Sequence, residues 1–386
     1  MSIQIQVPVI SNTYRRIAVS AFFYSNGLCF SSWASRIPQI KENLMLSDGQ
    51  LGLILLGLPL GSLLSLLPSG FLVERFGSKI LLLIAAIMHA TILPLIGLSP
   101  NIWVLAIVVF FFGMAGNFFN ITMNTQAVSV EEKYGRTIMA SFHGLWSIAG
   151  FSGAAIGALM ISLNIIPFYH FIVVSGIAFL ILTVSFYYLV PDYSKKKSQG
   201  LVFGKPDKKL LLIGIIAFCG MLCEGCMFDW SGVYFQKVVL AESGMVAAGF
   251  TSFMSTMALG RFFSDKITNH IGGRKMFMIS GIMISIGLLL SVIFPTLIFA
   301  VIGFFIVGAG VASVIPLTFS YAGKSTKLST GVAIALVATI GTFGFLIGPA
   351  LIGFISEAIN LRASFTLVAI MGIMISLLAW RNKSVL

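Results

Sequence analysis

Residues 211–236 read LLIGIIAFCGMLCEGCMFDWSGVYFQ, a mostly apolar run whose only charged residues are two acids, Glu224 and Asp229. The run is long enough to cross a lipid bilayer as one helix, because a spanning helix needs about 20 mostly apolar residues. A charged side chain at the centre of a bilayer costs at least about 2.5 kcal/mol on insertion scales. The two acids are therefore candidates for a functional site.

Eleven further apolar runs of similar length lie along the chain, and none of them contains an acid. Of all residues, 58% are hydrophobic and only 9% are charged, which lies far outside the range of soluble globular proteins. We therefore expect an all-α polytopic membrane protein with twelve transmembrane helices. The expected spans, in order, fall near residues 17–37, 51–73, 80–98, 102–128, 138–163, 168–190, 211–236, 245–264, 276–294, 297–321, 331–356 and 361–380.

Basic residues gather in alternate gaps between the expected spans. With a cytoplasmic N-terminus, twenty of the 24 lysines and arginines face the cytoplasm, and four face outward: Arg36, Lys41, Lys237 and Arg362. By the positive-inside rule, this bias predicts cytoplasmic termini, and we expect a multi-pass protein of a bacterial inner membrane. It also accounts for the net charge of +12 without a nucleic-acid partner, since no basic segment is interleaved with aromatic residues.

The chain contains an internal duplication. The motif Cys29-x-x-x-Trp33 recurs as Cys226-x-x-x-Trp230, and the glycine patterns of the fourth and fifth spans recur in the tenth and eleventh. Such matches in the same order indicate a repeat. A charged segment separates the halves, so we expect an N-terminal six-helix bundle at residues 1–190, a cytoplasmic linker at 191–210 and a C-terminal six-helix bundle at 211–386.

The gap between the second and third spans carries the pattern Gly70-x-x-x-Glu74-Arg75-x-Gly77-Ser78-Lys79, which is partly echoed around Asp265. With the six-plus-six arrangement, this pattern resembles the signature of the major facilitator superfamily, in the branch around fucose permease. The resemblance implies two bundles related by a pseudo-twofold axis along the membrane normal, with substrate bound between them. It also suggests an inner gate at these loops, formed by Gly70, Glu74, Arg75, Gly77, Lys79 and Asp265.

Polar side chains form stripes on several spans. Asn117, Asn120 and Asn124 lie on one helical face of the fourth span, a pattern that favours a water-filled cavity over single interhelical hydrogen bonds. On the fifth span, His143 and Trp146 share a face, so His143 either contacts substrate or protons or is an interfacial residue. We add to the candidate site Asn26 of the first span and the repeat-matched pair Trp33 and Trp230, for which membrane-interface anchoring is the alternative.

Glu224 and Asp229 differ in their expected surroundings. Five helical residues turn the second carboxyl group about 140° from the first and place it about 7 Å further outward. The expected spans offer Glu224 no basic partner, since no arginine or lysine is expected at mid-membrane. We therefore expect Glu224 to be protonated in at least one state or bound to a cationic substrate. A structural hydrogen bond is the alternative for Glu224, and solvation at the helix end is the alternative for Asp229.

These features predict a secondary active transporter, monomeric and without a cofactor, that moves a small polar solute such as a sugar-like or amine-bearing metabolite, with proton coupling through Glu224. An efflux antiporter is the second candidate, although the fifth span lacks a Gly-Pro pair and the fourth lacks an arginine. Channels need filter segments or rings of charge. A membrane enzyme would need a nucleophile–base pair or a metal cluster, and neither the cysteines nor the scattered histidines form one.

Overall fold

The computed structural model describes residues 11–135, 138–191, 208–323 and 330–382, which are helical apart from short turns and contain no strand in these ranges. In this part of the chain, thirteen α-helices and two short 3-10 helices follow one another. They are α1 (Asn12–Asn43), α2 (Asp48–Phe76), α3 (Ser78–Gly97), α4 (Ile102–Tyr134), α5 (Met139–Ser162), α6 (Pro167–Ser185), η1 (Phe186–Tyr188), α7 (Lys208–Lys237), η2 (Ser243–Met245), α8 (Ala248–Ile271), α9 (Gly273–Ile293), α10 (Leu297–Val311), α11 (Val314–Gly323), α12 (Thr330–Ala358) and α13 (Leu361–Arg381).

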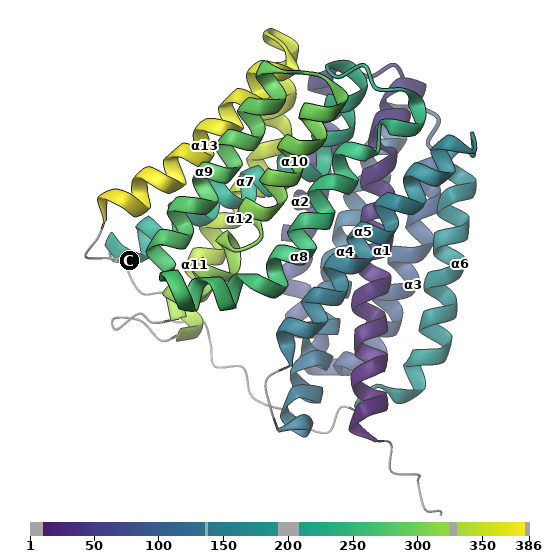
Figure 1. The fold of residues 1–386 in the computed structure, drawn as a ribbon. Helices are drawn as coiled ribbons and strands as arrows, with labels where there is room; N and C mark the ends of the chain where they lie inside the picture. The colour runs from purple at the N-terminus through teal and green to yellow at the C-terminus, as the bar shows by residue number, and fades with distance from the viewer. Residues whose placement is uncertain (1–10, 136–137, 192–207, 324–329, 383–386) are drawn as a thin grey trace, which may run out of the picture.

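The helices form two bundles side by side, α1–α6 in one and α7–α13 in the other (Figure 1). Each expected span corresponds to one helix except the tenth, which is broken between α10 and α11. Pro316 lies in the first turn of α11. Because proline has no N–H to donate, it is well tolerated in the first turn of a helix, where the N–H groups have no intrahelical partner, so Pro316 suits the start of α11. The prediction of an all-α fold is confirmed.

Ten of the described helical segments are long and apolar enough to span a membrane, and α1 and α8 are more polar than the others. Helix α1 is largely surrounded by other helices, whereas α8 has one exposed face that includes Leu259, Phe262 and Phe263. Helix α1 packs on α5, α6 and α7, and α8 packs on α5, α7 and α10. Side chains such as Arg36, which is fully buried, therefore face protein instead of lipid. The protein is a multi-pass membrane protein in which a buried charged side chain such as Arg36 packs against other helices.

Glycines allow α2 and α4 to cross in close contact. A Cβ atom on Gly61 would overlap the carbonyl oxygen of Phe110, and one on Gly113 would overlap the carbonyl oxygen of Leu58. Neither position has space for a methyl group, because the obstacle is backbone on both sides. Small residues of this kind are the usual means by which membrane helices approach each other closely.

We expect Gly61→Ala to lower the midpoint of thermal unfolding of the purified protein, because overpacking of this kind costs about 1–3 kcal/mol. The matched control is Gly176→Ala on α6, where an added Cβ has no neighbour within 4 Å. The control should leave the midpoint unchanged. Equal midpoints for the two variants would show that the α2–α4 crossing does not depend on the missing side chain.

Candidate functional site

A cavity of about 440 Å³ lies between the two bundles. Its walls come from α1 to α5 in the first bundle and from α7, α8 and α12 in the second. Seven of the ten substrate or proton residues predicted from the sequence line it: Asn26, Asn117, Asn120, His143, Trp146, Glu224 and Asp229. The structure therefore brings together most of the predicted polar stripes at one site.

Three predicted residues do not line this cavity. The side chain of Asn124 lies one turn beyond Asn120, and its amide donates to the Oδ1 of Asn120 at 2.8 Å. Trp33 and Trp230 are fully buried within the core, and neither indole N–H has a hydrogen-bond partner in the described part of the chain. Neither tryptophan faces lipid, so the alternative of an interface anchor is wrong for both.

Glu224 forms an ion pair with Arg261 of α8. The Nη2 atom of Arg261 lies 2.8 Å from the Oε1 atom of Glu224, and Nη1 donates to the Oγ of Ser147 on α5 at 2.9 Å. Arg261 thus connects the two bundles at the cavity wall. The arginine contacts both the acid of its own bundle and a hydroxyl of the other.

The expectation that Glu224 has no basic partner is wrong, as is the expectation that no arginine lies deep in the membrane. Helix α8 continues to Ile271, so Arg261 lies ten residues, or about 15 Å, before its end rather than in a loop. The count of basic residues on the cytoplasmic side therefore includes one residue too many. A signal was present in the sequence, since Arg261 falls inside the eighth expected span, residues 245–264.

Two amides of the cavity wall, Asn26 and Asn117, each use one atom to join neighbouring helices. The Oδ1 of Asn26 accepts a hydrogen bond from the indole N–H of Trp146 at 2.9 Å. The Nδ2 of Asn117 donates to the Oγ of Ser65 at 2.8 Å and to the carbonyl oxygen of Ser62 at 3.0 Å. These residues therefore hold helices together and line the cavity at the same time.

His89 of α3 also lines the cavity, although the sequence analysis did not assign it to the site. Its imidazole stacks on the ring of Phe112, with centroids 4.2 Å apart and planes 14° from parallel. Gly116 makes room for it, because a Cβ there would lie 3.0 Å from the Cε1 of His89. The available signal was a single histidine in an otherwise apolar span.

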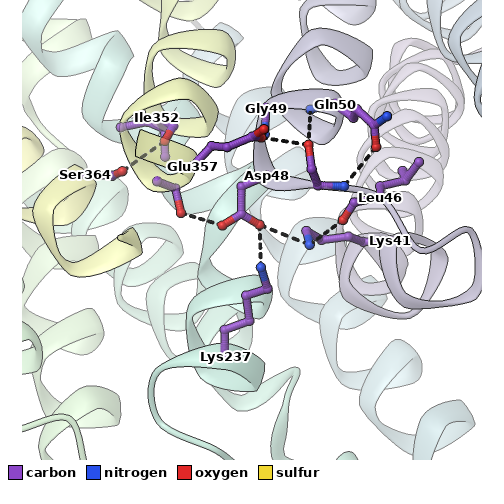
Figure 2. A network of polar contacts seen from close by, with 11 residues as sticks. Lys41, Leu46, Asp48, Gly49, Gln50, Lys237, Ile352, Glu357 and Ser364 are labelled. Carbon is purple, nitrogen blue, oxygen red and sulfur yellow. Dashed lines mark hydrogen bonds and ion pairs between the residues drawn. The ribbon is translucent and has the colours of Figure 1, made fainter. Parts of the chain in front are cut away.

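A polar network joins the bundles where α1 ends and α2 begins, at the far end of α1 from Asn12, and this side is here called the opposite side (Figure 2). The Asp48 carboxylate, in the first turn of α2, accepts hydrogen bonds from Lys41 of α1, Lys237 of α7 and Ser356 of α12, at 3.0, 2.7 and 2.5 Å. The side chain of Asp48 is 9% exposed. One buried acid therefore links helices from both bundles.

A second acid strengthens this network from the other direction. The Glu357 carboxylate of α12 accepts from the backbone N–H of Gly49 at 2.5 Å and from the Oγ of Ser47 at 2.7 Å. An anion is favoured at the N-terminus of α2, because the first N–H groups of a helix lack intrahelical partners. Close backbone contact between Gly52 and Gly353 brings the two helices together here. The bundles are thus held together on the opposite side.

The predicted inner gate stays a prediction. Gly77 ends α2 with φ of 85°, and Gly272 ends α8 with the same angle, so the two halves share this left-handed turn. The guanidinium of Arg75 lies over the ring of Phe76, and Lys79 lies 4.8 Å from the ring centroid of Phe186. Gly70, Glu74 and Asp265 are helical, but their side chains lie outside the described part of the structure.

Two bundles of membrane-spanning helices around a central polar cavity define the class of membrane transporters, and comparisons with known proteins identify the family. The model of the Major Facilitator Superfamily matches residues 18–255 and 220–385. The chain therefore belongs to this superfamily of transporters, which are not enzymes. The narrower resemblance to the fucose permease branch stays a prediction.

Relatives cover almost the whole chain. An uncharacterized MFS-type transporter of Yersinia pestis is 32% identical over 357 residues, which is 92% of this chain and 93% of the relative. The uncharacterized transporter y4wD of Sinorhizobium fredii is 33% identical over 365 residues, with 94% and 96% covered. The fold is similar to that of a mutant of the nucleoside transporter NupG, with a TM-score of 0.79, 12% identity, and 96% and 99% of the two chains covered.

We expect Asp48→Asn to weaken the closure of the opposite side, because the neutral amide loses its ionic attraction to both lysines. Breaking a buried ion pair costs about 3–5 kcal/mol, so the population open to this side should rise at least about tenfold. The measurement is the labelling rate of a cysteine introduced at Thr342, which lines the cavity, by an impermeant thiol reagent added on the opposite side. Glu242→Gln, which removes an exposed acid after α7, is the matched control. If Asp48→Asn labels no faster than this control, the network does not hold the side closed.

Proposed function

We propose that this protein is a secondary active transporter that moves a small polar solute, sugar-like or amine-bearing, by alternating access through the central cavity. The positive-inside pattern supports a bacterial inner-membrane location with both termini in the cytoplasm. The cavity in the structure would then be closed to the outside by the network at Asp48. The protein would work as a monomer in the lipid bilayer, exchanging protons and solute, without a cofactor or nucleic acid.

The observation that carries this proposal is the ion pair between Glu224 and Arg261 at the cavity wall. A buried ion pair is weak evidence for stability, because well-packed apolar residues of similar volume are often at least as stable. Ionisable residues inside a membrane are otherwise rare and mark ion and substrate pathways. A pair that faces a cavity and also contacts Ser147 of the other bundle is therefore better explained by transport than by folding.

The geometry supports proton coupling through Glu224. While Glu224 is ionised, it holds Arg261 in the position from which Nη1 donates to Ser147 across the bundle interface. Protonation of Glu224 removes the ionic attraction, so Arg261 is no longer fixed between the bundles. A proton would then shift the equilibrium between the two cavity states, because it binds one state more tightly than the other. Besides Glu224 and Arg261, the titratable groups among the described residues that line the cavity are His89, His143 and Asp229.

The gate on the side of the termini is proposed to be the turn at Gly77 with its flanking residues Glu74, Arg75 and Lys79. The corresponding turn in the second bundle, near Asp265, would act in the same way. In the state of the structure the opposite side is held together, so this gate would close only when the cavity turns to the other side. The equal left-handed turns at Gly77 and Gly272 support a matched role for both loops.

We expect Glu224→Gln to separate exchange from accumulation. The amide keeps the shape of a protonated carboxyl group but cannot release a proton. In reconstituted vesicles, the variant should exchange solute across the membrane in counterflow and lose accumulation driven by a proton gradient. The solute is one that stabilises the purified protein in a thermal-shift screen of sugars, amino acids, nucleosides and vitamins.

The control for this experiment is Glu242→Gln, which replaces an exposed acid outside the cavity. This variant should accumulate solute as the wild type does. Wild-type accumulation by Glu224→Gln would show that Glu224 is a structural group and not the coupling site. The sign of the gradient that drives wild-type accumulation also reports direction. Uptake toward the less acidic side indicates symport, and movement toward the acidic side indicates exchange for protons, as in an efflux antiporter.

A further inference from the structure

The carboxyl group of Asp229 faces the cavity without a partner. Asp229 is only 7% exposed, and in the described part of the chain no hydrogen bond or ion pair joins its side chain to another residue. Glu224, the other acid of the cavity, is already paired with Arg261. Because a buried carboxylate without a counter-charge is costly, Asp229 is stabilised either by a proton or by a positive charge from outside the chain.

The balance of charge in the cavity limits what that positive charge can belong to. Among the described lining residues, two carboxylates, Glu224 and Asp229, face one permanently charged side chain, Arg261. When both acids are ionised, one negative charge is left over, so a solute with a single positive charge restores neutrality. An anionic solute would add a second unbalanced charge. His143 lies one turn before Ser147, at the Arg261 end of the cavity, where its ring packs on Phe23.

Three aromatic rings lie together in the wall of the cavity that Asp229 also lines. They are Phe30 of α1, Trp146 of α5 and Phe228 of α7, and all three line the cavity. The ring centroids lie 6.0 Å apart for Phe30 and Trp146, 5.3 Å for Phe30 and Phe228, and 6.4 Å for Trp146 and Phe228. Aromatic faces attract organic cations, and clusters of such rings bind ammonium groups. A carboxylate next to such a cluster favours an organic ammonium ion.

Two amides of the cavity wall have free polar atoms that can form hydrogen bonds with the part of the solute away from its ammonium group. The oxygen of Asn26 is used by Trp146, which leaves the amide nitrogen as a donor. The nitrogen of Asn117 is used by Ser62 and Ser65, which leaves the amide oxygen as an acceptor. A hydroxyl group both donates and accepts, so it satisfies either kind of atom. A cavity of about 440 Å³ suits a small molecule with several hydroxyl groups.

We propose that the transported solute is a small hydroxylated amine with a single positive charge, whose ammonium group binds Asp229 beside Phe30, Trp146 and Phe228. This inference rests on the proposed transport function and narrows its substrate class. Asp229 and Phe228 belong to the second bundle, and Phe30 and Trp146 belong to the first. A bound amine therefore contacts both bundles at once. Such contacts are needed if binding of the solute is to influence how the two bundles move relative to each other.

The test uses matched probes that differ in one group. The purified protein is heated with glucosamine or glucose, with glucamine or sorbitol, and with glucuronate as the acidic member. An amine of this panel should stabilise the protein, while the neutral and acidic members should not. Asp229→Asn should weaken binding of that amine at least about tenfold, since a charge-assisted hydrogen bond is lost. Asp229→Glu keeps the charge and should retain part of the affinity, and Glu242→Gln should bind as the wild type does.

Stabilisation by neutral or acidic members alone, or by no amine of the panel, would overturn the inference. So would unchanged affinity of the amine for Asp229→Asn. Counterflow of the same probes separates this result from the transport proposal. Exchange of a neutral solute contradicts the amine class and leaves the transport function intact. An amine that binds through Asp229 but is never exchanged supports the site and contradicts transport.

Discussion

The cost of removing a charge from water decides where this protein places its ionisable side chains. In the interior of the bundles, the described charged groups are satisfied by partners on other helices, apart from Asp229. Arg36 donates to His170 at 3.1 Å and to the carbonyl oxygen of Ile165 at 2.9 Å. Each such contact holds two helices in a defined position, because a buried charge that lost its partner would be strongly destabilising.

Several of these contacts differ from the others because they cross between the bundles. Arg261 reaches Ser147 at the cavity wall. On the opposite side, Lys237 reaches Asp48 and Glu357 accepts from Ser47. Contacts across an interface that must open cannot be permanent, and ionic contacts are suited to this, since water can replace them when the interface opens. Close approaches at glycine occur both within a bundle, as between Gly61 and Phe110, and across the interface, as between Gly52 and Gly353. The ionic contacts across the interface are therefore the ones that we expect to change when the cavity opens to the other side.

Much of the fold was predictable from the sequence, because lipid imposes a simple rule on the chain. Backbone groups in a bilayer must be satisfied internally, so long apolar runs become helices. The stripe of asparagines on α4 likewise placed Asn117 and Asn120 at the cavity. Arg261 was misplaced because the boundary between span and loop is unreliable where a helix extends beyond the apolar run. Lys41, Asp48, Lys237 and Glu357 meet only after the bundles assemble, so no local pattern reveals them.

The most direct measurement of alternating access is a pair of distances on opposite sides of the membrane. Spin labels at Met45 and Ile359 report the opposite side, and labels at Phe76 and Ile267 report the side of the termini. All four positions are exposed, and the native cysteines are buried. On addition of the transported solute and acid, the first distance should lengthen while the second shortens, by more than about 2 Å each. Two distances that stay fixed, or that change in the same direction, would contradict movement of the two bundles about a central site.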